Sequence, residues 1–344
     1  MNIRYRSMEP KDVTKCVEHI AAHPILGFRY GTTIERLPSA IRSVLGRDAA
    51  VALVFEECQG SAAKLLGVGM AVFVSDDFLR EVKSKPHFWI GPELATRITR
   101  GISPLLSDAE VRKANSTVGL NLVVWHNSPY PKDRERAEVG TTVMVAFDQS
   151  YRGFRLKELI AQADCIEQLW GMRNAGGLYF NRIRRCYGDF PKVDFGDFSN
   201  EPHNVGISRE LALTRGGSWV GSLFLHAPPQ FGFSRAEQRQ LFLALNGSTD
   251  EELTHMLDCS LSAVKKNWRM IYDRVARCFP DVVTDNSSMD RESQSRGKQK
   301  KQRLLDYLRK HPEELRPISR KLIQQASARI DTRANAESIL DTDV

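Results

Sequence analysis

Apolar residues in the first two thirds of the chain follow patterns typical of both strands and helices. Short stretches rich in β-branched and other apolar residues predict strands at 3–6, 50–57, 64–74, 118–126 and 139–147. Helical spacing of apolar positions predicts helices over 10–20 and 154–170. A last strand is predicted within 219–233, broken by two prolines. The mixture predicts an α/β or α+β domain over residues 1–228.

Beyond this domain the apolar positions show helical spacing throughout, which predicts an all-α domain over residues 231–280. Ser234 and Glu237 fit a capping box, in which each residue bonds a free backbone N–H of the first turn. Thr249 is predicted to cap a second helix and Ser260 a third.

The third predicted helix has one apolar face and a cationic surface. Its apolar residues recur at helical spacing, at Val264, Trp268, Ile271 and Val275. A helix of this kind fits the DNA major groove, where Lys and Arg reach phosphates and base edges. We therefore expect double-stranded DNA as a partner. The predicted DNA contacts are Thr249, Ser260, Ser262, Lys265, Lys266, Arg269 and Arg274.

The order of residues in this segment resembles the LuxR-type helix-turn-helix domain. The matching positions are Ser234–Glu237, Leu241, Gly247, Thr249, Glu252, Leu253, Leu257, Ser260, Ala263–Lys265 and Ile271–Tyr272. The resemblance implies a transcriptional regulator in which Lys265 lies at the DNA and Val264 is buried beneath it. Region four of sigma factors has a similar helix pair, but the chain shows no other recognisable sigma region.

The chain after the third helix is polar and charged. Residues 281–302 are poor in aromatic side chains and are predicted to be a flexible linker, followed by a helix and a tail over 303–344. LuxR-type domains carry a dimerising helix soon after the recognition helix. The apolar stripe of Leu304, Leu305 and Leu308 suggests a displaced equivalent, so we expect a pairing face there and a homodimer.

Two stretches of the first domain resemble the GNAT acyltransferase fold. Residues 3–20 resemble its opening strand, turn and helix, and residues 139–160 resemble its acyl-CoA motif, whose glycines let pyrophosphate approach a helix N-terminus. The resemblance implies an acyl-CoA or other anionic ligand at Arg152, Gly153 and Arg155. An exposed basic turn is the alternative interpretation. Because Arg155 and Lys157 replace small residues, we predict absent or marginal acetyl-CoA turnover.

Composition and charge narrow the classes of protein. The chain has 344 residues, a net charge of +7 and six scattered cysteines without a C-x-x-C pair. This pattern predicts neither a disulfide framework nor a metal site. The most apolar run, 65–74, is far shorter than a membrane helix, so we expect a cytoplasmic protein without a membrane partner.

These observations favour a transcriptional regulator whose first domain senses a small-molecule effector or dimerises. The alternative is a GNAT-type N-acyltransferase that carries a nucleic-acid-binding domain. A third class is a non-catalytic scaffold whose helical domain binds protein. A regulator should bind duplex DNA, an acyltransferase should release thiol from acetyl-CoA, and a scaffold should do neither.

Overall fold

The chain divides into two compact units in the computed structural model, Met1–His226 (unit 1) and Ala227–Val344 (unit 2). The structure describes residues 2–59, 62–84, 89–129, 136–163, 166–180, 203–214, 217–245, 247–283 and 293–317. Within these ranges, no helix combines the length and the apolar character that a membrane crossing requires.

Unit 1 is built on a mixed sheet, so an α/β class is observed. Its strands are β1 (Asn2–Ser7), β2 (Ala50–Gln59), β3 (Ala62–Val74), β4 (Leu120–Pro129), β5 (Leu156–Ala163), β6 (Leu178–Phe180) and β7 (His203–Ser208). The described strands are ordered β1-β2-β3-β4-β5-β7-β6. All neighbours are antiparallel except β4 and β5, which are parallel.

The parallel pair separates towards the carboxyl ends of its strands. β4 and β5 are paired only where 120–123 lie beside 156–160. Beyond that point β4 stays paired with β3 as far as Pro129, and β5 stays paired with β7 as far as Ala163. A place where sheet topology changes at the carboxyl ends of strands is a common location for ligand sites in α/β folds.

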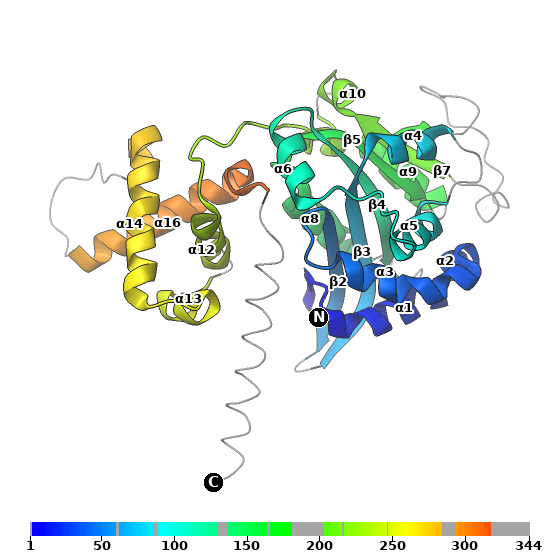
Figure 1. Ribbon diagram of the computed structural model, residues 1–344, viewed down its shortest axis with the longest axis horizontal. Helices are drawn as coiled ribbons and strands as arrows, with labels where there is room; N and C mark the ends of the chain where they lie inside the picture. Colours follow the sequence, from blue (N-terminus) through cyan, green and yellow to red (C-terminus); the bar gives the residue numbers. More distant parts are fainter. Residues whose placement is uncertain are drawn as a thin grey trace, which may run out of the picture. The chain divides into compact units, whose positions relative to one another are not determined.

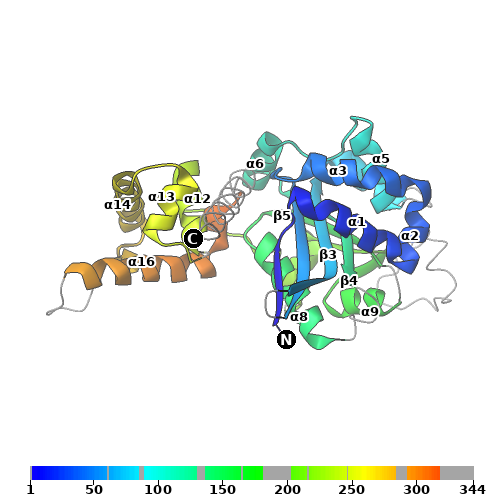
Figure 2. The same cartoon turned by 90° about the horizontal axis from the view of Figure 1, so that it is seen from below.

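Helices cover both faces of this sheet. Helices α1 (Val13–Ala22), α2 (Pro24–Tyr30), α3 (Leu37–Val44) and α5 (Ile90–Thr99) cover one face, and α8 (Ala137–Tyr151) and α9 (Ile166–Asn174) cover the other (Figures 1 and 2). The remaining helical elements in the described residues of the unit are η1 (Pro10–Asp12), η2 (Gly31–Arg36), α4 (Asp76–Ser84), α6 (Asp108–Ser116), α10 (Arg209–Thr214) and α11 (Trp219–Ser222).

Three predictions for unit 1 were wrong. The strand predicted at 139–147 is part of α8, and the helix predicted over 154–170 is β5 followed by α9. The strand predicted within 219–233 is absent from the described residues there, and α11 begins that stretch. The strands predicted at 3–6, 50–57, 64–74 and 118–126 correspond to β1 to β4 and are confirmed, as is helical structure over 10–20.

Unit 2 is helical in its described residues. Its elements are α12 (Arg235–Leu245), α13 (Asp250–Leu257), α14 (Leu261–Cys278), α15 (Pro280–Val283), α16 (Ser293–Lys310) and η4 (Pro312–Leu315). The first three helices begin at the predicted caps, Ser234, Thr249 and Ser260, and each cap side chain accepts a backbone N–H.

The segment after α14 differs from its prediction. Most of α15 and the start of α16 lie within 281–302, which was predicted to be a flexible linker. Residues 284–292 of that stretch and the predicted tail beyond residue 317 lie outside the described residues. Leu304, Leu305 and Leu308 are buried in the apolar core of unit 2 itself. They therefore do not form the free pairing face that was expected, and a homodimer would have to use another surface.

Candidate functional site

Helix α14 is held with one face in the core of unit 2. Val264, Ile271 and Val275 are fully buried, and Trp268 is nearly so, as the spacing predicted. They pack in one apolar cluster with leucines of α12 and α16. Burial of this stripe determines which residues of α14 can face outwards.

A buried glutamine further fixes the position of α14 against α12. Gln240 of α12 is 1% exposed, and its Nε2 group donates to the carbonyl oxygen of Val264 at 3.3 Å. Its Oε1 atom accepts a hydrogen bond from Nδ2 of Asn267 at 2.9 Å. Because these bonds connect side chains to defined points on α14, they restrict rotation of the helix about its axis as well as its distance from α12.

The start of α13 is joined to α14 and α16 through Asp250. The indole Nε1 group of Trp268 donates to Oδ1 of Asp250 at 3.1 Å. The Nζ atom of Lys301 lies 2.9 Å from the same oxygen and 4.9 Å from the centre of the Trp268 ring. Burial and the nearby Asp250 carboxylate raise the pKa of Tyr272, which stacks on Trp268. Asp250 thus has a cation beside it, which reduces its repulsion of an approaching phosphate.

The outward surface of α14 carries cations that have no acidic partner among the described residues. Ser262, Lys265, Lys266 and Arg269 are exposed, as predicted for residues that contact DNA. Within the described part of the chain, Lys265, Lys266 and Arg269 form no ion pair. Met270 is also exposed, at 49%, one turn after Lys266. Sequence analysis missed Met270, although its helical spacing from Lys266 could have placed it on this surface.

Arg274 does not belong to this free surface. Its Nε atom lies 3.4 Å from Oε1 of Glu237, a residue that is completely buried. Glu237 also accepts the backbone N–H of Ser234 at 2.7 Å, in the predicted capping box. This guanidinium compensates a buried carboxylate within unit 2, and a DNA contact at Arg274 stays a prediction.

Thr249 and Ser260, the caps of α13 and α14, form hydrogen bonds within unit 2 that limit which of their groups could contact DNA. The Thr249 hydroxyl accepts the backbone N–H of Glu252 at 3.2 Å, and the Glu252 carboxylate accepts that of Thr249 at 2.7 Å. The Ser260 hydroxyl accepts the backbone N–H of Ala263 and lies 2.8 Å from that of Ser262. The backbone N–H groups of Thr249, Glu252 and Ala263 are therefore already used within unit 2, and the cap hydroxyls can still donate their protons to phosphate.

The anion site predicted in unit 1 lies at the wrong end of a helix. Arg152 is the C-cap of α8, and its backbone N–H donates to the carbonyl oxygen of Asp148. Its side chain is also 3.7 Å from the Asp148 carboxylate. Gly153 has φ +88°, and Arg155 begins the return to β5. A helix C-terminus carries negative partial charge, so Arg152, Gly153 and Arg155 do not form the expected phosphate cradle.

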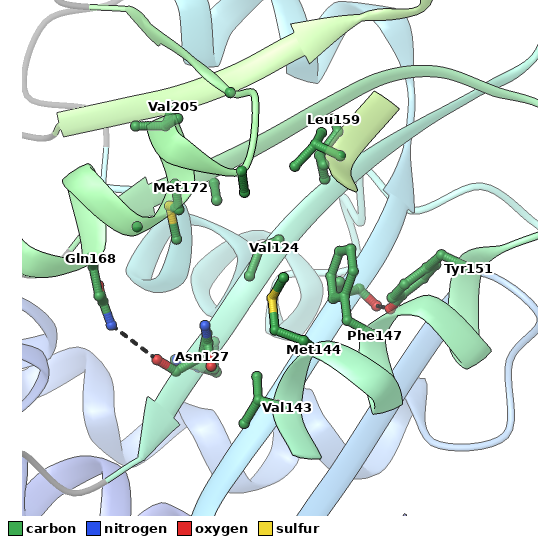
Figure 3. A pocket seen from close by; sticks show the side chains of 18 of the residues that line it. Val124, Asn127, Val143, Met144, Phe147, Tyr151, Leu159, Gln168, Met172 and Val205 are labelled. Carbon is green, nitrogen blue, oxygen red and sulfur yellow. Dashed lines mark hydrogen bonds between the residues drawn. The ribbon is translucent and has the colours of Figure 1, made fainter. Parts of the chain in front are cut away.

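A cavity of about 390 Å³ lies between the sheet of unit 1 and helices α8, α9 and α11. Figure 3 shows apolar side chains around it from α8, α9 and strands β4, β5 and β7. The side chains with polar atoms include Asn127, Tyr151 and Gln168. The cavity has the size of a small-molecule site.

Comparison with known proteins assigns neither unit to a family. The sequence matches no protein-family model and no curated protein. In the described ranges, no group of three or more His, Cys, Asp or Glu side chains is placed to hold a metal ion.

Proposed function

We propose that this protein is a DNA-binding transcriptional regulator and that α14 enters the major groove. The observation that carries the proposal is the outward surface of α14, where Lys265, Lys266 and Arg269 are exposed without ion pairs among the described residues. The buried stripe and the bonds from Gln240 hold this surface in one orientation. The resemblance of the sequence to LuxR-type helix-turn-helix domains supports the same function.

The cations of α14 have different proposed roles. Lys265 and Arg269 lie one turn apart in line with Ser262, and they are proposed to reach base edges. Lys266 lies to the side and is proposed to contact phosphate. Met270 is proposed to make apolar contact beside Lys266, as side chains do with the methyl group of thymine.

The test is the affinity of the full-length protein for duplex DNA from its own upstream region and for random duplex, measured by fluorescence anisotropy across a salt series. Lys265→Ala or Arg269→Ala should each cost about 1–3 kcal/mol of discrimination. Lys266→Ala should weaken both duplexes alike and lower the salt slope by about one unit.

Lys113, an exposed lysine of α6 in unit 1, supplies a matched control. Lys113→Ala should leave both affinities and the salt slope unchanged. If Lys265→Ala and Arg269→Ala both bind the upstream duplex like wild type, the recognition-helix assignment is wrong.

Unit 1 is proposed to be the effector-sensing part of this regulator, and its cavity supports that role. N-acyl transfer is the second candidate function. The favouring observation is the β4-α8-β5 crossover, in which α8 follows the carboxyl end of β4 where β4 and β5 separate. Thiol release from acetyl-CoA in the presence of an amine tests this alternative, and robust turnover would support it over a purely sensory role.

A further inference from the structure

The cavity of unit 1 has apolar walls on the sheet side and on the helix side. Sheet residues that line it include Leu53, Phe55, Val124 and Leu159. Val143, Met144 and Phe147 line it from α8, and Met172 lines it from α9 (Figure 3). Met144 is 36% exposed, so the cavity has an edge that solvent reaches. Apolar walls of this kind favour an occupant that buries hydrocarbon surface.

Charged groups are missing from the described lining, which contains no Asp, Glu, Lys or Arg. His126, which also lines the cavity, is almost fully buried, and this burial lowers its pKa to about 3. The imidazole is therefore neutral near neutral pH. A charged ligand would lose hydration here without gaining a counter-charge, so the lining disfavours ions.

Two exposed glycines lie in helices at the edge of the cavity. Gly140 of α8 and Gly171 of α9 both line the cavity. Neither has a positive φ, and a Cβ atom added at either position would have no neighbouring atom within 4 Å. Glycine destabilises a helix interior relative to alanine, so these positions carry a cost that packing and backbone conformation do not explain.

Other glycines of the lining are explained by packing. A Cβ atom would come within 2.9 Å of the Phe55 ring at Gly69, and within 2.2 Å of the Leu159 carbonyl oxygen at Gly206. Gly140 and Gly171 are both exposed, so the open space at each position is continuous with solvent at the edge of the cavity. Because both residues line the cavity, a bulky side chain placed at either position has room to extend towards it.

Asn127 and Gln168 lie together at one end of the cavity in Figure 3, and Tyr151 lies at the other. The Nε2 group of Gln168 donates to the backbone carbonyl oxygen of Asn127 at 3.3 Å. The side-chain amide of Asn127 is only half-buried and can both donate and accept a hydrogen bond. A ligand with a carbonyl, amide or hydroxyl group could therefore be oriented at this end.

We propose that this cavity binds an uncharged, largely apolar small molecule with one hydrogen-bonding group, which lies towards Asn127. The use of this molecule as an effector rests on the proposed regulatory function. The chemical class of the ligand is inferred from unit 1 alone, so ligand binding is measured without DNA. Failure of the ligand proposal therefore leaves the DNA-binding proposal testable, and the reverse also holds.

The probes are a matched pair that differ in charge. N-phenyl-1-naphthylamine is neutral and apolar, and 1-anilinonaphthalene-8-sulfonate carries a sulfonate on the same ring system. Titration of the full-length protein should show saturable fluorescence enhancement with the neutral probe. Binding of the sulfonate should be weaker by about tenfold or more, because the described lining residues include no Lys or Arg. Equal affinity for the two probes would overturn the neutral-ligand proposal.

Filling the cavity from α8 tests the location. Gly140→Leu should weaken the neutral probe by about tenfold or more, because the side chain occupies the ligand volume. Thr141→Leu, at the next position of α8, is the control and should leave binding unchanged, because Thr141 is not among the described residues that line the cavity. Circular dichroism establishes that each variant is folded, and Gly171→Leu in α9 replaces Gly140→Leu if that variant does not fold. Absence of saturable binding, or binding to a folded cavity-filling variant with wild-type affinity, would overturn the proposal.

Discussion

Replacing Arg274 by alanine should destabilise unit 2 and leave the proposed contact with DNA largely intact. The guanidinium lies 3.4 Å from the carboxylate of Glu237, whose side chain is completely buried. Arg274→Ala leaves that carboxylate with the backbone N–H of Ser234 but without its cation. The substitution therefore leaves the buried Glu237 carboxylate without a nearby cation, which destabilises unit 2. Arg274 is far along α14 from Lys265, so the proposed DNA contacts near Lys265 are not removed.

The magnitude follows from the burial of the two partners. Breaking a fully buried ion pair costs about 3–5 kcal/mol, and an exposed pair contributes about 0–1 kcal/mol. Arg274 is 38% exposed, so water and salt already screen this pair. Since Glu237 also keeps a hydrogen bond to Ser234, we expect a loss of about 1–3 kcal/mol in the free energy of unfolding of unit 2.

Hydrogen–deuterium exchange of peptides from α12 and α14 would measure this loss within the full-length protein. Arg269→Ala is the matched control, because Arg269 is an exposed arginine on the same helix. Its effect on stability should stay within about 0.5 kcal/mol. The salt slope of DNA binding, measured where both variants are folded, should be unchanged for Arg274→Ala.

The opposite result would refute this reasoning. If Arg274→Ala exchanges like wild type and lowers the salt slope by about one unit, Arg274 contacts phosphate and its pairing with Glu237 contributes little. A double-mutant cycle with Glu237→Gln separates the pair from other effects. Additive losses in that cycle would show that the two side chains are not coupled.

Two further predictions concern unit 1. Gly140→Ala should raise the free energy of unfolding of unit 1 by about 0.5–1 kcal/mol in chemical denaturation. Alanine favours the helix, and its Cβ atom would meet no neighbouring atom. A loss of stability would contradict the open space at this position. Burial lowers the pKa of His126 to about 3, so the unfolded chain binds the additional proton as pH falls below about 6.5. Unit 1 should therefore lose up to about 1.4 kcal/mol per pH unit between about pH 6.5 and 3 from this group, and His126→Gln should remove that contribution from the measured pH dependence of unfolding.

The helices of unit 2 were predictable because their signals are local. Ser234, Thr249 and Ser260 each bond a backbone N–H three residues ahead, so the cap and its partner lie within one turn of sequence. The buried stripe of α14 is likewise a repeat within a single helix. The position of α16 was less accessible, because its leucines fill a core made by helices distant in sequence.

Unit 1 shows where periodicity misleads. The β-branched residues of 139–147 favoured a strand, yet Val139, Val143, Phe147 and Tyr151 recur at intervals of four and α8 packs through them. Leu156, Leu159, Ile160 and Ala163 have helical spacing, but β5 is covered on both faces and buries almost every residue. A strand buried on both faces loses its alternation, so its apolar pattern can imitate a helix.

The candidate interface has two parts, the exposed cations Lys265, Lys266 and Arg269 and the paired Arg274. Exposure of Lys265, Lys266 and Arg269 follows from the buried stripe on their own helix, which the sequence spacing defines. The status of Arg274 depends on Glu237, which lies 37 positions earlier, and the helical spacing of α14 contains no information about that partner. A cationic surface predicted from one helix is therefore reliable only where no second helix supplies a buried acid. Arg274→Ala and Lys266→Ala therefore test the interface best as a pair. We expect Arg274→Ala to lower the stability of unit 2 and Lys266→Ala to lower the affinity for DNA.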